Sequence, residues 1–197
     1  FTENGQEGAT AANSPYYGGG LYLSTGLCLD CTFVRNFCDN GGGAYVASSS
    51  AVVRDCLFEK NRQTGWYRGA AILCNPNSPL ALVSNCVFNA NVATNWSGRT
   101  IISNAQLVDC AISNHVVYGA VVQNSNMTRC RVVNNKITCG GGIDLDDILD
   151  GSVAALTRTN VSCLFVGNHV TETTATTGNK IILNCTYVSN RFDGANY

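Results

Sequence analysis

The stretch Cys86-Val-Phe88-Asn-Ala-Asn91 recurs along the chain with the same residue types at the same places. Each copy has a cysteine, an aromatic residue two positions later and an asparagine three positions after that; further copies are Cys31–Asn36, Cys56–Asn61, Cys163–Asn168 and Cys185–Asn190. Two looser copies begin at Cys110, with His115 in the asparagine place, and at Cys130, which runs to Asn135. Successive cysteines lie 20 to 33 residues apart, a period typical of solenoid repeats.

Two further positions repeat between these copies. A glycine precedes alternating apolar residues at Gly20, Gly43, Gly69, Gly98, Gly119 and Gly142. An apolar residue stands three positions before most of the cysteines, at Cys28, Val53, Val83, Leu107, Met127 and Ile182, while Asn160 breaks that column. Each copy therefore offers three short period-two segments and no helical period. The sequence predicts an all-β fold, a right-handed parallel β-helix of about seven to eight coils, as one domain over residues 1–197.

Stacked coils place like residues on like residues, so the repeat also predicts the core. The cysteine and the aromatic residue, two positions apart, should point inward as two parallel columns. The asparagine tolerates left-handed backbone geometry, which suits a sharp corner, and stacked asparagines can hydrogen-bond along the axis. An antiparallel β-sandwich is the alternative, but it does not require the same residue types in every unit.

The composition limits the kinds of partner. Only 13% of the 197 residues are charged and the formal net charge is -1, so bulk charge attracts neither nucleic acid nor an anionic membrane. No apolar run approaches the roughly 18 residues of a membrane-spanning helix. The chain begins at Phe1 rather than methionine, which indicates a processed or excised segment.

The repeated motifs also carry a family resemblance. Phe-x-x-Asn occurs at Phe1–Asn4, Phe33–Asn36, Phe58–Asn61, Phe88–Asn91 and Phe165–Asn168, and a loose Gly-Gly-Ala motif occurs at 42–45. The chain thus resembles the polymorphic outer-membrane proteins of chlamydiae and, more broadly, secreted β-helices of the pectate-lyase type. The resemblance implies an extracellular or cell-surface protein with a structural or adhesive role. Its partners would be a glycan or a host or surface protein.

A polysaccharide-degrading β-helix, either lyase or hydrolase, is the alternative from another functional class. Such enzymes need clustered carboxylates, or carboxylates with calcium and a basic residue, on one face. The acidic cluster of this chain, Asp144, Asp146, Asp147 and Asp150, suits a calcium site, an acid pair or a solvated loop. His115 and His169 each follow an asparagine at a turn and are expected to be corner residues. We therefore expect no catalytic residues, no cofactor and no metal.

The eleven cysteines require their own interpretation. Neighbouring ladder cysteines would have parallel Cβ vectors, which strains a disulfide, so most of the seven are expected to be buried thiols. Cys38, Cys74 and Cys139 lie outside the ladder and are better disulfide candidates. A zinc site is not expected, because the chain lacks paired CxxC motifs and has only two histidines.

Aromatic and arginine residues gather near the corners. Trp66 and Trp96 each lie ten residues after a ladder cysteine, which predicts the same corner in consecutive coils. With their neighbours they form a candidate binding stripe made of Tyr17, Trp66, Tyr67, Arg68, Trp96, Arg99 and Tyr118. Such residues are typical of interface hot spots and of sugar-stacking platforms. The alternative is that long corner loops fold back and bury these aromatics.

The two ends of the sequence show no polar cap of the kind that closes a solenoid. Phe1 and Asn4 finish one copy of the motif, and Gly194 to Tyr197 resemble the first residues of a further coil. The expected assembly ends are therefore Phe1 and Asn4 on one side and Phe192 and Tyr197 on the other. We therefore expect either head-to-tail self-association through these ends or further coils in a longer protein.

Overall fold

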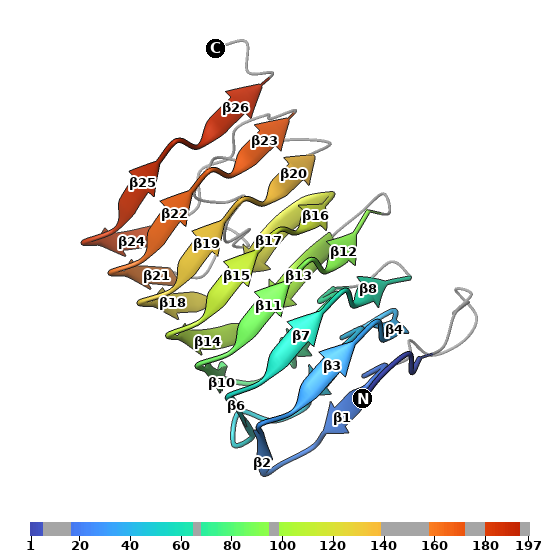
Figure 1. The fold of residues 1–197 in the computed structure, drawn as a ribbon. Coiled ribbons are helices and arrows are strands. Elements are labelled where there is room, and N and C mark those ends of the chain that lie inside the picture. The colour runs from blue at the N-terminus through green and yellow to red at the C-terminus, as the bar shows by residue number, and fades with distance from the viewer. Residues whose placement is uncertain (6–16, 65–67, 95–98, 139–157, 172–179, 194–197) are drawn as a thin grey trace.

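A computed structural model describes residues 1–5, 17–64, 68–94, 99–138, 158–171 and 180–193 of the chain. Every regular element within these ranges is a β-strand, and every pairing between strands is parallel. The chain winds upward through four sheets in turn, so that the strands stack as rungs of a right-handed β-helix (Figure 1). The predicted fold class is confirmed.

The four sheets are named here in the order in which each rung visits them. Sheet I contains β1 (Leu21–Leu23), β5 (Ala44–Val46), β9 (Ile72–Cys74), β13 (Arg99–Ser103) and β17 (Gly119–Gln123). Sheet II contains β2 (Leu27–Leu29), β6 (Val52–Arg54), β10 (Ala81–Ser84), β14 (Ala105–Val108), β18 (Asn126–Thr128), β21 (Arg158–Val161) and β24 (Lys180–Leu183).

Sheets III and IV complete each rung. Sheet III contains β3 (Thr32–Val34), β7 (Leu57–Glu59), β11 (Val87–Asn89), β15 (Ala111–Ser113), β19 (Arg131–Val133), β22 (Leu164–Val166) and β25 (Thr186–Val188). Sheet IV contains β4 (Phe37–Cys38), β8 (Arg62–Gln63), β12 (Val92–Ala93), β16 (Val116–Val117), β20 (Lys136–Thr138), β23 (His169–Thr171) and β26 (Arg191–Asp193). Thr2 and Gly5 pair with Val34 and Phe37 and so begin one further level before the first full rung.

The division into strands differs from the expected three segments per coil. The structure has four, because the corner at the asparagine separates sheet III from a short strand in sheet IV that the period-two pattern did not reveal. The apolar column of sheet II is aligned as expected: Cys28 pairs with Val53, Val53 with Val83, and Val83 with Leu107. Asn160 continues this column between Met127 and Ile182 and is buried.

The two inward columns of the motif are also present. The five interior ladder cysteines are buried, and Cys31 and Cys185 at the two ends are half-buried. The rings of Phe33, Phe58 and Phe88 stack nearly parallel, with centroids 4.6 and 5.0 Å apart. Because offset stacking at this distance is favourable in addition to burial, the aromatic column ties each rung to the next.

Each rung turns through single residues in the left-handed region of backbone conformation, and these are not the asparagines of the motif. The residue before the asparagine has this geometry, as at Lys60 (φ 53°) and Ala90 (φ 51°), and so does the residue before the cysteine, as at Asp55 (φ 56°). The motif asparagine itself is not among the residues of positive φ. Our assignment of the left-handed geometry to the asparagine was therefore wrong by one position.

This displacement makes Ala90 a strained residue, since an L-residue with a Cβ loses about 1–2 kcal/mol in the left-handed region. Replacing Ala90 with glycine is expected to raise the free energy of unfolding by about 1 kcal/mol, part of the relief being offset by the freer unfolded chain. Ala111→Gly, in strand β15, is the matched control and should lower stability by about 0.5–1 kcal/mol. Equilibrium denaturation of both variants measures these changes. If both variants lost the same free energy of unfolding, Ala90 would not be strained.

The motif asparagines form a hydrogen-bonded ladder inside the corner between sheets III and IV. Asn61 donates from its backbone N–H (2.8 Å) and from Nδ2 (3.0 Å) to Oδ1 of Asn91. Its Nδ2 also donates to the carbonyl of Phe33 in the preceding rung (2.9 Å). The same arrangement repeats along the axis, so buried backbone groups at every corner are satisfied by a side chain of the next rung.

The glycine motif has a packing reason. A Cβ on Gly43 would lie 2.5 Å from the carbonyl oxygen of Ala71 and 2.8 Å from the ring of Phe58. Ala44 pairs with Ile72, so Gly43 lies level with Ala71, and not with Gly69 as a comparison of the motifs suggests. The glycine thus lets sheet I approach the aromatic column.

The expected disulfides at Cys38 and Cys74 are not formed, and both residues are buried free thiols. Burial in an apolar environment raises the pKa of Cys74 to about 12. The spacing of these cysteines in the sequence did not show that each occupies its own interior position. Cys139 lies outside the described residues.

Candidate functional site

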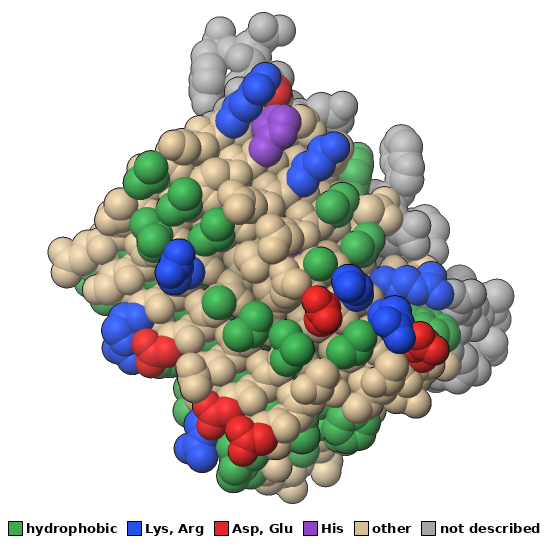
Figure 2. Space-filling model, viewed as in Figure 1, with side chains coloured by type: hydrophobic (Ala, Val, Ile, Leu, Met, Phe, Trp, Pro, Cys, Tyr) green, Lys and Arg blue, Asp and Glu red, His purple; other side chains and the backbone are tan. Residues whose placement is uncertain are grey.

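The flank of the solenoid formed by sheets III and IV carries few charges. Figure 2 shows a surface that is mostly neutral polar, with small separate groups of apolar side chains and with charged side chains that lie singly or in small groups of both signs. Several described charges pair across rungs: Arg129 donates to both carboxylate oxygens of Asp109 (2.6 and 2.7 Å), and Arg35 pairs with Glu3 (2.7 Å). The pairing with Arg129 lowers the pKa of Asp109. These exposed pairs add little to stability.

The candidate binding stripe is only partly described. Trp66, Tyr67 and Trp96 lie outside the described residues, as does the acidic cluster at Asp144–Asp150. Tyr17 is 43% exposed and its ring lies 4.4 Å from that of Tyr45, on the first rungs of sheet I. Tyr118 is half-buried between β16 and β17, about four rungs or roughly 19 Å further along the axis.

The two arginines of the candidate binding stripe lie at the starts of neighbouring rungs of sheet I. Arg68 is half-buried just before Gly69, and burial lowers its pKa. Arg99 begins strand β13. The described members are thus spread along one edge and do not form a single cluster, and the binding stripe stays a prediction.

The two histidines lie at corners, as the sequence predicts. His115 is buried and replaces an asparagine in the ladder: its Nδ1 accepts the N–H of Asn91 (2.9 Å), and its own N–H donates to Oδ1 of Asn135 (3.0 Å). Burial lowers the pKa of His115 to about 3. His169 opens β23, and its Nε2 lies 2.7 Å from Oδ2 of Asp193, whose Oδ1 accepts a hydrogen bond from Nε of Arg191 (2.7 Å). These contacts give both rings structural partners.

The two ends of the described solenoid expose residues that are interior elsewhere. At the C-terminal end, Ile182 is 38% exposed although its column is buried in the middle rungs. At the N-terminal end, Phe1 stacks on Phe33 (centroids 4.8 Å apart) and its ring is otherwise open. A depression of about 340 Å³ opens beside it, lined by Phe1, Leu21, Leu23, Leu27, Cys28, Leu29 and Cys31.

The asparagine ladder gives the two ends opposite hydrogen-bonding character. In every rung the backbone N–H of the ladder residue donates toward the C-terminal end, and the last such bond runs from the N–H of Asn168 to Oδ1 of Asn190 (3.0 Å), which also accepts from Nδ2 of Asn168 (2.9 Å). Asn4 begins the ladder by donating to Oδ1 of Asn36 (2.9 and 3.2 Å). Among the described residues, the N–H of Asn190 therefore has no acceptor and Oδ1 of Asn4 has no donor.

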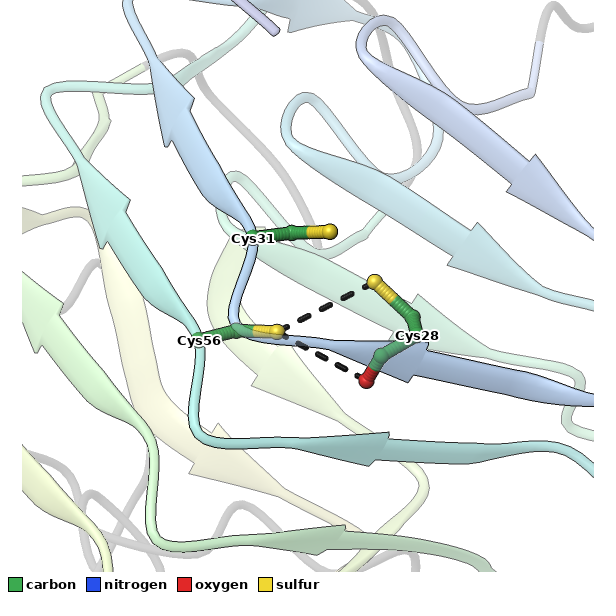
Figure 3. Close-up of side chains that lie close together, drawn as sticks. All are labelled: Cys28, Cys31 and Cys56. Carbon is green, nitrogen blue, oxygen red and sulfur yellow. Dashed lines mark hydrogen bonds between the residues drawn. The ribbon is translucent and has the colours of Figure 1, made fainter.

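One cluster of chemically active side chains was missed by the sequence reasoning. Sγ atoms of Cys28, Cys31 and Cys56 all lie within 4.8 Å of one another at the N-terminal end (Figure 3). Within the described ranges, no other group of three or more histidine, cysteine, aspartate or glutamate side chains is close enough to share a metal ion. The signal in the sequence was the CxxC spacing of Cys28 and Cys31, which we treated as one apolar and one ladder position.

Comparisons with known proteins give no family for the chain, since neither a protein-family model nor a curated protein matches it. The described part of the chain contains no helix long and apolar enough to cross a membrane.

Proposed function

We propose that this protein is a non-catalytic, extracellular structural β-helix whose ends stack head to tail on further copies of itself. The observation that supports this most strongly is the opposite character of the ladder ends. An Asn190 donor of one copy and the Asn4 acceptor of the next complete the bond that every interior rung already makes. Such a joint is heterologous and does not close, so it produces a filament.

The aromatic column supports the same joint. Tyr187 stacks on Phe165 at the C-terminal end (4.6 Å), and Phe1 stacks on Phe33 at the other. Joining the ends brings Phe1 of one copy over Tyr187 of the next, with β25 beside Phe1–Thr2. Exposed strand edges at both ends template such an addition. An adhesive role would then belong to the flanks, where the candidate binding stripe is repeated in every copy.

Two end-blocked variants test the polarity of the joint. Phe1→Lys disables the N-terminal end and Tyr187→Lys disables the C-terminal end, because each puts a charge in the aromatic column. Each variant alone should stay monomeric, whereas the unmodified chain forms filaments. Mixed in equal amounts, the two variants should give a dimer that grows no further, since each has one intact end of opposite kind.

Sedimentation velocity over a range of concentrations separates these species. Val116→Lys is the matched control, because this residue is 41% exposed in the middle of the flank and should leave filament growth unchanged. Circular dichroism verifies that each variant is folded. A mixture that stays monomeric while the unmodified chain polymerises would contradict the head-to-tail joint.

A further inference from the structure

Three thiols meet at the N-terminal end for a reason that the repeat explains. Cys31 and Cys56 are consecutive members of the cysteine ladder, at the corner between sheets II and III. The neighbouring sheet II column has Val53, Val83 and Leu107 in its inner rungs and a thiol only at Cys28. Only at the first rung, therefore, does a third sulfur atom lie beside two consecutive cysteines of the ladder. Sγ of Cys28 lies 3.8 Å from Sγ of Cys56.

We propose that Cys28, Cys31 and Cys56 bind one thiophilic divalent d¹⁰ cation of the zinc type through their three sulfur atoms. A zinc–thiolate bond is about 2.3 Å long, so a tetrahedral site places its sulfurs about 3.8 Å apart. The separation of Cys28 and Cys56 already has this value. The remaining separations, at most 4.8 Å, close by about 1 Å when Cys31, which is half-buried, rotates about its χ1 bond.

The depression supplies the route of entry and the fourth coordination position. Cys28 and Cys31 belong to its lining together with leucine side chains, so an ion approaching from the open end reaches the sulfurs directly. Water occupies the fourth position on that side, as in zinc sites with three protein ligands. Binding replaces three S–H bonds with three S–metal bonds and releases three protons to solvent. The complex carries a net charge of -1 with a divalent ion and -2 with a monovalent one, so an apolar site favours the divalent ion.

Two of the three thiols in the cluster are hydrogen-bonded to backbone carbonyls. In the metal-free protein, Cys31 donates its proton to the carbonyl of Leu29 (3.1 Å) and Cys56 donates to that of Arg54 (3.1 Å). A metal ion displaces the proton of each thiol, so these hydrogen bonds do not prevent binding.

Cobalt(II) is the probe for this site, because tetrahedral cobalt–thiolate complexes absorb visible light. The reduced, oxygen-free chain should bind one equivalent of Co²⁺ with this spectrum, and one equivalent of Zn²⁺ should abolish it. A pH indicator in weak buffer should report about three protons released per zinc ion. The site does not depend on end-to-end assembly, so the titration is made at a concentration where the chain is monomeric.

Cys28→Val is the decisive variant, because valine occupies the same column in the next two rungs and should be accommodated there. Removing a residue that only hydrogen-bonds to a metal ligand weakens metal binding roughly 10–100-fold, so removing a ligand itself should weaken it by at least this factor. Cys110→Ala removes a ladder thiol three rungs beyond Cys31 and should leave the titration unchanged. Absence of a cobalt–thiolate spectrum in the unmodified chain, or its persistence in Cys28→Val, would overturn the site. Formation of a Cys28 disulfide in air in the presence of equimolar zinc would overturn it too.

Discussion

Replacing Phe58 with alanine is expected to lower the free energy of unfolding by about 3–5 kcal/mol. Phe58 has no exposed surface, and its ring is stacked between those of Phe33 and Phe88 at 4.6 and 5.0 Å. Removing it leaves a cavity that neighbouring rungs cannot close, because the backbone ladders on both sides hold them at a fixed spacing. It also removes two ring–ring contacts of about 0.5–1.5 kcal/mol each, which this range includes.

Guanidinium denaturation followed by circular dichroism measures this loss. Phe1→Ala is the matched control, because Phe1 belongs to the same column but is 51% exposed and has one ring neighbour. The control should lose about 1 kcal/mol. Comparable losses in the two variants would mean that the interior aromatic column contributes no more than its end.

Acid should destabilise the protein through His115. The folded-state pKa of this residue is lowered to about 3 by burial, against an ordinary value near 6.5. The unfolded chain therefore binds a proton below about pH 6.5 that the folded chain does not bind, so stability is fully present above that pH and falls as the pH drops toward 3. At about 1.4 kcal/mol for each pH unit, the loss between pH 7 and pH 4 is about 3 kcal/mol.

His115→Asn should remove this loss, because asparagine is the ladder residue in the neighbouring rungs. Its Oδ1 would accept the N–H of Asn91, as Nδ1 of His115 does now, and its Nδ2 would gain the acceptor that the buried Nε2 lacks among the described residues. Denaturation curves at pH 7 and pH 4 measure the effect as the difference between the two proteins. Protonation of carboxylates such as Asp109 changes the stability of both proteins by similar amounts, so this contribution cancels in the difference. Equal acid sensitivity of both proteins would show that His115 is not buried as a neutral ring.

The sequence predicted those features that every rung repeats. Cysteine, aromatic and apolar positions recur at fixed offsets, so the inward columns and the asparagine ladder could be read before any coordinates. The strand in sheet IV was not predicted, because Phe37–Cys38 and Arg62–Gln63 are too short to show a period. The path of the backbone in this strand is set by the hydrogen bonds of the asparagine ladder at the preceding corner, and not by the side chains of the strand itself.

The thiol cluster and the left-handed corners were missed for a different reason. Among the described residues, nine of the sixteen non-glycine residues with positive φ are asparagine or aspartate, which tolerate this geometry. Arg35, Lys60 and Ala90 have it too, so backbone hydrogen bonds between rungs impose it even where local residue preference does not favour it. Cys28 fits an apolar column as well as valine does, and only the distance to Cys56 distinguishes the two roles. Such features depend on which residues of neighbouring rungs come into contact, and the spacing of residues along the sequence does not show this.

The head-to-tail joint is tested most directly by electron cryomicroscopy of the 197-residue chain at high concentration. The aromatic column has eight levels from Phe1 to Tyr187. At about 4.8 Å per level, a continued ladder predicts polar filaments with an axial repeat of about 38 Å per subunit. Monodisperse single particles at that concentration, or filaments in which subunits alternate in direction, would contradict the joint.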